Sequence, residues 1–334
     1  RCERMKIIVS FIYLTFALLS PSIALSNQSA DAREVESGSA APDLAFGAYQ
    51  RGDFKAAMSE AKKRLQINPK DAAALALIGQ LYIEGAGVNR DAKQAMDWFR
   101  RAADLGNAES AYIYGAALLQ GLNVPKDRNR ARDYLEKAAA LNHGSALHLL
   151  GEMALENEGK PSDFSRALDY FKRADAAGNA DASYALGVLY KTGKGLDKDL
   201  NTAAVYFKRA ADLDLSAAMV EYAIMQFNGV GAPRDQQAAI ALLRRAGMAG
   251  NAVAQNRLAH IYAEGLGVAP DLSLARYWRD KAREGGLADS TLDFLSSASS
   301  KDGLDKQELS APGAPTQMKT QSPMPPSFQA PLKK

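Results

Sequence analysis

The chain repeats itself at an interval of 36 residues. Gly79 recurs as Gly115, Gly151 and Gly187, and then as Ala223 and Ala259. Asp91 recurs in the same phase as Asp127, Asp163, Asp199, Asp235 and Asp271. Two alanine columns are Ala95, Ala131, Ala167, Ala203, Ala239 and Ala275, and Ala102, Ala138, Ala174, Ala210, Ala246 and Ala282. A period of this length predicts a stack of equal units in which each unit contacts its neighbours.

The first part of each unit is predicted to be a helix. Ala74, Ile78, Leu81 and Tyr82 fall at helical spacing and form one apolar face. Gly79 lies inside this helix, where glycine costs about 1 kcal/mol relative to alanine. We therefore expect a neighbouring helix to approach too closely at this column for a larger side chain.

A turn and a second helix complete the unit. Gly85 suits the left-handed conformation that ends a helix, and Asp91 is placed to cap the next one. The second helix carries Trp98 and Ala102 on its apolar side and closes at Gly106. Aromatic residues in the Trp98 column would suit sugar stacking, but their helical spacing favours a place in the core between helices.

The repeated pattern resembles a known family. The motif A-x-x-x-[LIY]-G-x-x-Y-x-x-G-x-G-V-x-x-D-x-x-x-A-x-x-W-[FY]-x-x-A-A-x-x-G-N is similar to the Sel1-like repeat, a relative of the tetratricopeptide repeat, and extends over residues 72–287. The third unit departs from it, with Asn157 and Lys160 in place of Gly and Val. The resemblance implies an all-α fold, an α/α superhelical solenoid of about six helix-turn-helix repeats. It also implies an adaptor that holds other proteins.

The chain outside the repeats is predicted to divide into five segments. They are residues 1–26 as upstream residues and signal peptide, 27–42 as a disordered lead-in, 43–71 as a tetratricopeptide-like N-terminal cap, 288–297 as a C-terminal capping helix, and 298–334 as a disordered tail rich in Pro, Ser, Gln and Lys. The two caps are expected because a terminal repeat must present to water a face that inner repeats bury.

The start of the sequence resembles a secretory signal. Lys6 precedes an apolar run, Ile7 to Leu19, and Ser22 to Ala24 resembles a small-x-small cleavage site. The apolar run is shorter than the ~20 residues that span a bilayer. We therefore expect a periplasmic or secreted protein with no membrane span after signal cleavage; an uncleaved anchor is the alternative.

The net charge gives no support to nucleic-acid binding, and the chain has one cysteine. The formal net charge of +3 falls to +1 without residues 1–24, which hold three basic and one acidic side chain. A nearly neutral chain gives no electrostatic reason to bind nucleic acid. Cys2 is the only cysteine, and it lies within the predicted signal segment.

No arrangement typical of catalysis or cofactor binding is found in the sequence. His143, His148 and His260 are the three histidines, and they are spread over different repeats. Zinc binding and nucleophilic catalysis both need convergent groups. The G-x-G turns are not followed by GK[ST], so they do not predict a phosphate loop. We expect no enzyme activity, no cofactor and no metal.

The remaining candidate site is a surface on the first helices, which line the concave side of this type of solenoid. Residue types on this surface vary from repeat to repeat, while the core columns stay constant. A groove that binds one extended partner would show such variation. Positions at which no contact restricts the residue type would vary in the same way. The predicted partner-binding residues are Tyr112, His148, Glu152, Tyr184, Val188, Lys191, Ile224, Phe227, Asn256 and His260. Of these, Tyr184, Val188, Ile224 and Phe227 form an expected apolar middle. Contiguous exposed apolar surface usually marks a contact site.

Two functional hypotheses follow. The first is a non-enzymatic periplasmic adaptor or regulator that binds an envelope or secreted protein, including the outer domain of a membrane sensor, through the concave groove. The alternative is a cell-envelope enzyme or a peptidoglycan-binding factor. Hydrolytic turnover would support the second hypothesis, whereas loss of partner binding on changes in the groove would support the first.

Overall fold

The computed structural model describes residues 43–156 and 161–296. In these residues the chain forms α-helices and one 3₁₀ helix. The helices are α1 (Leu44–Gln50), α2 (Phe54–Ile67), α3 (Ala72–Glu84), α4 (Ala92–Asp104), α5 (Ala108–Gln120), α6 (Arg128–Ala140), α7 (Gly144–Glu156), α8 (Phe164–Ala176), α9 (Ala180–Thr192), α10 (Leu200–Asp212), α11 (Ser216–Asn228), α12 (Gln236–Met248), α13 (Ala252–Glu264), α14 (Leu272–Glu284) and η1 (Ser290–Ser296). We call α3, α5, α7, α9, α11 and α13 the first helices of repeats one to six. The second helices are α4, α6, α8, α10, α12 and α14.

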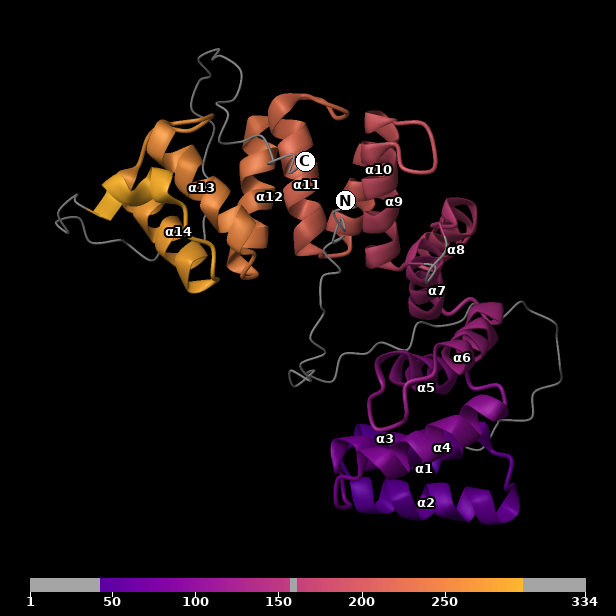
Figure 1. The fold of residues 1–334 in the computed structure, drawn as a ribbon. Coiled ribbons are helices and arrows are strands. Elements are labelled where there is room, and N and C mark those ends of the chain that lie inside the picture. Colours follow the sequence, from indigo (N-terminus) through magenta and orange to yellow (C-terminus); the bar gives the residue numbers. More distant parts are fainter. Residues whose placement is uncertain (1–42, 157–160, 297–334) are drawn as a thin grey trace, which may run out of the picture. The chain divides into compact units, whose positions relative to one another are not determined.

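Each helix packs mainly against the helix before it and the helix after it (Figure 1). A first helix contacts the second helix of its own repeat and the second helix of the preceding repeat, as α9 does with α10 and α8. This chain of neighbour contacts is an α/α solenoid, as the sequence predicts.

The small-residue columns lie where helices meet. Every alanine in the Ala95 and Ala102 columns is completely buried. A Cβ atom built on Gly187 would lie 2.7 Å from the Phe207 ring, and one on Gly151 would lie 2.5 Å from the Phe171 ring. A phenylalanine of the second helix of the same repeat also lies against Gly79, whereas Leu135 lies against Gly115. The expected close approach at the glycine column is therefore confirmed.

The predicted turn chemistry is also present. The Asp91 side chain accepts a hydrogen bond of 2.9 Å from the Gln94 backbone N–H, and its five counterparts cap their helices in the same way. Gly85 ends α3 with φ of 72°. These caps satisfy backbone groups that a helix end otherwise leaves without partners.

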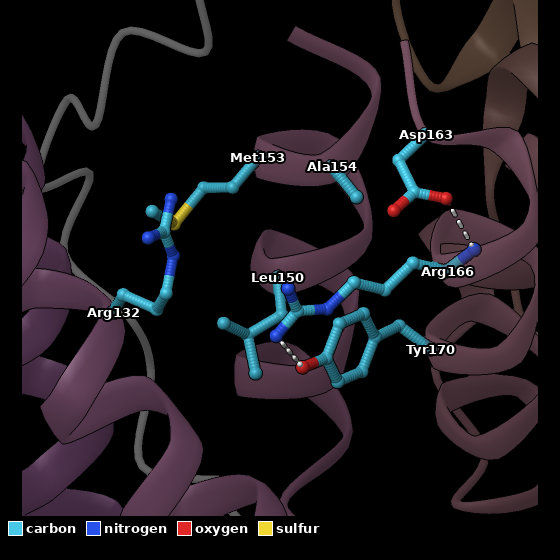
Figure 2. Close-up of a pocket in the computed structure, with 7 residues that line it drawn as sticks. All are labelled: Arg132, Leu150, Met153, Ala154, Asp163, Arg166 and Tyr170. Atoms are coloured by element: carbon cyan, nitrogen blue, oxygen red, sulfur yellow. Dashed lines mark hydrogen bonds between the residues drawn. The ribbon is translucent and has the colours of Figure 1, made fainter. Parts of the chain in front are cut away.

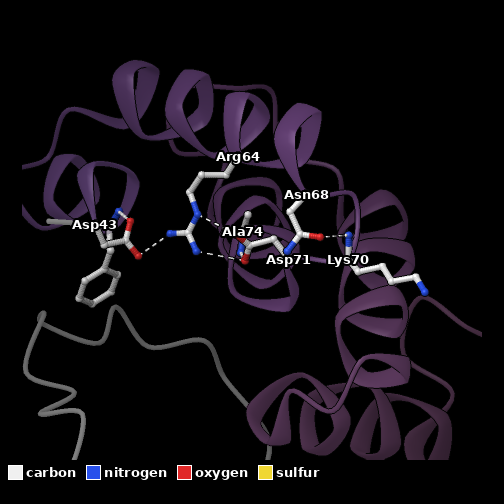
Figure 3. Close-up of polar contacts among 7 residues, drawn as sticks. Asp43, Arg64, Asn68, Lys70, Asp71 and Ala74 are labelled. Atoms are coloured by element: carbon white, nitrogen blue, oxygen red, sulfur yellow. Dashed lines mark hydrogen bonds and ion pairs between the residues drawn. The ribbon is translucent and has the colours of Figure 1, made fainter. Parts of the chain in front are cut away.

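An additional helix pair, α1 and α2, precedes the first repeat. The Arg64 guanidinium on α2 contacts two aspartates that begin other helices, Asp43 at 2.5 Å and Asp71 at 2.8 Å (Figure 3). Asp43 caps α1 and Asp71 caps α3. One cation thus connects the cap pair to the first repeat, and these bonds together hold the pKa of both carboxyls below their ordinary value despite partial burial.

A 3₁₀ helix lies where the C-terminal capping helix is predicted. Residues 290–296 form a 3₁₀ helix, and Leu292 and Leu295 on it are buried against α13 and α14. Residues three apart share a face in a 3₁₀ helix. Arg276 donates to the Leu295 carbonyl at 3.0 Å, and Arg279 donates to the Leu292 carbonyl at 3.4 Å, so α14 satisfies two carbonyls of this element.

Some sequence predictions lie outside the described residues. They are the signal segment in residues 1–26, the lead-in 27–42, the altered turn at Asn157 and Lys160, residue 297 of the capping helix, and the tail 298–334.

Candidate functional site

The predicted partner surface corresponds to one stripe of the first helices. In each first helix we count positions from the residue of the glycine column, which is Gly79 in the first repeat. The residues at positions −3, +1 and +5 are four apart and therefore share one face of the helix. The residues five after the column are exposed in all six repeats: Glu84, Gln120, Glu156, Thr192, Asn228 and Glu264. We call this stripe the first-helix face.

Phe227 does not belong to this face, and its predicted exposure was wrong. Its side chain is 3 % exposed and lies in the core with Met219 and Ala223. Phe227 is four residues after Ala223 in the glycine column, so it follows that column along the buried side of the helix. Ile83, at the same position of the first repeat, is buried as well.

Lys191 occupies the same position in the fourth repeat and is half-buried. Its Nζ atom contacts the Glu221 carboxylate of the fifth repeat at 2.6 Å. Lys191 therefore connects two repeats and is not a free cation on the first-helix face.

At the N-terminal end of the face, Tyr112 is half-buried and stacks on His143, with ring centroids 4.8 Å apart. His143 precedes α7; its Nδ1 accepts a hydrogen bond from the Ala146 N–H, and its Nε2 lies 2.9 Å from Glu109. Burial, with Glu109 and Asp181 nearby, raises the pKa of the Tyr112 hydroxyl. Tyr112 is thus only partly accessible, on a surface that already holds carboxylates.

A cluster of ionisable groups occupies the boundary between repeats three and four. His148 and Glu152 lie one turn apart on α7, with 3.9 Å between Nε2 and the carboxylate, and the His148 ring lies against Phe171. Although half of the Glu152 side chain is exposed, loss of surrounding water raises its pKa. His148 opposes this shift, while Glu156 and Asp181 add to it. Negative charge therefore exceeds positive charge here.

The middle of the face is apolar but not strongly exposed. Tyr184, Val188 and Ile224 are all half-buried, and the Tyr184 ring contacts Phe207 with centroids 5.6 Å apart. Burial and the nearby Glu221 raise the pKa of the Tyr184 hydroxyl. The predicted apolar middle is thus reduced to three partly covered side chains beside an acidic residue.

The C-terminal end of the face is covered by the chain itself. His260 is 4 % exposed, with Nε2 2.9 Å from Asp289 and Nδ1 3.1 Å from Glu264. Asn256 also donates to Asp289 at 3.0 Å. His260 and Asn256 were predicted as partner-binding residues, but the segment before η1 already occupies their polar atoms.

Two residues of the face were missed by sequence reasoning. Asp181 lies in the first turn of α9, three residues before Tyr184 and seven before Val188, which is the spacing of one helix face. Glu221 of the fifth repeat lies near Tyr184 of this face and helps to raise the pKa of its hydroxyl. The helical spacing could have revealed Asp181, whereas the place of Glu221 depends on the fit between two repeats.

The described residues give little support to a metal site, a small-molecule cavity or a membrane span. They contain no group of three or more His, Cys, Asp or Glu side chains suited to a metal ion. A recess between α6, α7 and α8 is lined by Arg132, Arg166 and Tyr170 among others (Figure 2) but holds only about 40 Å³, little more than one water molecule. Of the helices described, none has the length and apolar character needed to cross a bilayer.

Comparison with known proteins identifies the repeat. A family model described as the Sel1 repeat matches six consecutive segments, residues 72–107, 108–143, 144–179, 180–215, 216–251 and 252–287. These segments coincide with the six pairs of first and second helices.

A solved structure of a Sel1 repeat protein has the same architecture. A crystal structure of a Sel1 repeat protein from Oxalobacter formigenes is 29 % identical, with a TM-score of 0.63, over 72 % of this chain and 96 % of that one. A protective antigen of uropathogenic Escherichia coli strains is 22 % identical, with a TM-score of 0.49, over 76 % of this chain and 66 % of that one. No functionally curated protein shows a significant match to the chain.

Proposed function

Because the chain belongs to the Sel1 repeat family, whose fold typically serves as a scaffold for protein–protein interaction, we propose that it is an adaptor that binds a protein partner through the first-helix face. The proposal places the adaptor in the periplasm or outside the cell, on the basis of the signal-like start of the sequence. The partner is an envelope or secreted protein.

The observation that carries the proposal is the composition of the first-helix face in repeats three to five. Tyr184, Val188 and Ile224 are apolar side chains that the fold leaves half-covered, and Glu152 and Asp181 lie beside them. Adjacent partly exposed apolar groups with a charged rim are typical of protein interfaces. The charge predicts a partner segment that offers apolar side chains next to a basic one.

Capture by cross-linking in intact cells tests the proposal. We compare the wild type with a variant that carries Tyr184→Ser, Val188→Asp and Ile224→Asp. Phe227 is left unchanged because loss of a buried phenylalanine side chain costs about 3–5 kcal/mol, which would confuse unfolding with loss of binding. Val205→Asp is the matched control, since Val205 is 57 % exposed on α10 of the same repeat.

We expect the triple variant to lose proteins that the wild type and the Val205→Asp control both recover, while its helix content by circular dichroism stays unchanged. Recovery of the same proteins by all three would refute the assignment of the first-helix face. The cellular compartment is tested separately, by whether the full-length chain appears in the periplasmic fraction in a shortened form.

A further inference from the structure

One arginine interrupts an apolar column of the second helices. In repeats one, three, four and five this column contains Met96, Leu168, Ala204 and Ile240, all of them buried or half-buried. Repeat two has Arg132 at the same position. A guanidinium group at such a position loses part of its water and needs acceptors for its N–H groups.

Arg276, in the same column of repeat six, shows how such an arginine is satisfied. Its Nε donates to the Leu295 carbonyl at 3.0 Å, in the 3₁₀ element that follows the last repeat. Arg132 is also half-buried, but none of the described residues provides it with a hydrogen bond or an ion pair. Its acceptor therefore comes from water or from another molecule.

The first helix of repeat three differs from the other five in lacking a tyrosine. Each of the others has one tyrosine at position −1 or +3 from the glycine column, namely Tyr82, Tyr114, Tyr190, Tyr222 and Tyr262. Positions −1 and +3 lie one turn apart and share a helix face. Repeat three has Leu150 and Ala154 at these two positions, so no ring occupies this face of α7.

Repeat three thereby also lacks an oxygen atom that accepts hydrogen bonds from an arginine. In repeat two the Tyr114 hydroxyl accepts one from Arg130 at 3.1 Å. Arg166 holds the position of Arg130 in repeat three. Without that tyrosine, Arg166 donates to Glu136 at 3.2 Å and to Tyr170 on its own helix at 3.3 Å.

The recess between α6, α7 and α8 opens where the ring is absent. Leu150 and Ala154 line it, with Arg132 on the α6 side and Arg166 on the α8 side (Figure 2). Asp163 lines it as well, but this carboxylate caps α8 and accepts a hydrogen bond of 3.0 Å from the Arg166 backbone N–H. Two cations and one anion therefore leave the recess with an excess of positive charge.

We propose that this recess binds the carboxylate of an aspartate or glutamate side chain of a partner polypeptide. The carboxylate oxygens accept hydrogen bonds from the Arg132 guanidinium, and Arg166 adds positive charge from the other side. Arginine and carboxylate match in charge and in planar geometry.

The size of the recess supports this class of ligand. Its volume of about 40 Å³ admits a small planar head group, whereas an aromatic ring or a tetrahedral phosphate needs more space. The rest of the ligand then lies outside the recess, as the backbone of a polypeptide does. Leu150 and Ala154 lie outside the first-helix face, so the proposal does not depend on the binding site proposed there.

The test compares N-acetyl-glutamate α-amide with N-acetyl-glutamine α-amide, which has nearly the same shape but no charge. Titrations of the full-length chain followed by saturation-transfer NMR give the two affinities. We expect the glutamate derivative to bind about three- to tenfold more tightly. This is the lower part of the range for hydrogen bonds to a charged group, because the recess is open to solvent.

Two substitutions take their residue types from other repeats of the same chain. Arg132→Met, which matches Met96, removes the guanidinium; it is expected to abolish the preference for the glutamate derivative and to maintain or raise the urea midpoint. Ala154→Tyr, which matches Tyr190, fills the recess and abolishes binding of the glutamate derivative. Lys172→Met is the control, because it removes an exposed cation of α8 that does not line the recess, and it leaves the preference unchanged.

Equal binding of the two derivatives overturns the proposal, and so does a preference for the glutamate derivative that survives Arg132→Met. Full binding by Ala154→Tyr overturns the location in the recess. Tighter binding of acetate or inorganic phosphate than of the glutamate derivative overturns the polypeptide ligand and assigns the recess to a free anion. If circular dichroism shows that Arg132→Met impairs folding, the comparison of Ala154→Tyr with Lys172→Met decides the outcome.

Discussion

At the scale of the residue, the absence of a Cβ atom decides how closely two helices of one repeat approach. Gly187 lies inside α9, where its backbone freedom is a disadvantage. The Phe207 ring fills the space in which a methyl group would lie. The gain from burying a phenylalanine ring therefore exceeds the propensity cost of glycine, because an aromatic side chain buries far more surface than a methyl group.

Gly187→Ala is expected to destabilise the protein by about 1–3 kcal/mol, because the added methyl group forces the Phe207 ring to move. Gly47→Ala is the control, since its Cβ would meet only the flexible end of Arg51, at 3.2 Å. The control should gain up to about 1 kcal/mol from helix propensity. Urea unfolding followed by circular dichroism measures both. A neutral Gly187→Ala would show that the contact is loose.

At the scale of the element, polar side chains at helix starts set where each helix begins. Asp127 accepts a hydrogen bond of 3.0 Å from the Arg130 N–H at the start of α6. Its counterparts occupy the same position of every repeat, so each second helix begins at the same point of its unit. This regularity keeps the alanine columns in register along the stack.

Asp127→Ala is expected to cost about 1 kcal/mol of stability, the usual value for loss of an N-cap. Asp133→Ala on the same helix is the control, because Asp133 is exposed and lies on the outward side of α6. The shift in the urea midpoint compares the two variants. A control that costs as much as Asp127→Ala would contradict a specific capping role.

The Asp289 carboxylate joins the segment before the C-terminal 3₁₀ element to α13. Partial burial acts against the charged form of Asp289, but hydrogen bonds from His260, Thr291 and Asn256 outweigh it and hold its pKa well below the ordinary value. A lowered pKa in the folded state means that the carboxylate stabilises the protein above its unfolded pKa. This contribution disappears as pH falls through the folded value.

Asp289→Asn is therefore expected to cost about 1.5–3 kcal/mol at neutral pH, the range for hydrogen bonds to a charged group. The difference from the wild type should stay constant down to about pH 4 and shrink below it. Urea unfolding of both proteins across acidic pH provides the measurement. A difference that instead grows on acidification would contradict the assigned role of Asp289.

At the scale of the whole molecule, stability depends on how each repeat is joined to the next. Asp175 is buried at the boundary between repeats three and four, where it accepts a hydrogen bond from the Ser183 hydroxyl at 2.5 Å and pairs with Arg209. The pair of Glu136 and Arg166 lies at the boundary between repeats two and three, and both side chains are more than 40 % exposed. Solvent weakens the second pair much more than the first.

Asp175→Ala is expected to cost about 2–3 kcal/mol, because it leaves Ser183 and Arg209 without their acceptor. Glu136→Ala is the control and should cost less than about 1 kcal/mol, because it removes only the exposed pair with Arg166. Since repeats contact only their neighbours, Asp175→Ala should also broaden the unfolding transition, as repeats on the two sides separate. Hydrogen exchange by mass spectrometry would locate the opening. Equal costs for both variants would contradict the difference in burial.

The period, the described turns, the aspartate N-caps of the second helices and the core columns were predictable from the sequence, because they depend on residues close together in the chain or repeated in phase. Tertiary structure decided the rest. Phe227 is buried since it follows Ala223 along the contact side of α11, and His260 is sealed by Asp289 from the C-terminal segment. The pairing of Lys191 with Glu221 likewise joins two repeats. Each of these outcomes depends on which side chains neighbouring units bring together, and helical spacing within one unit does not contain that information.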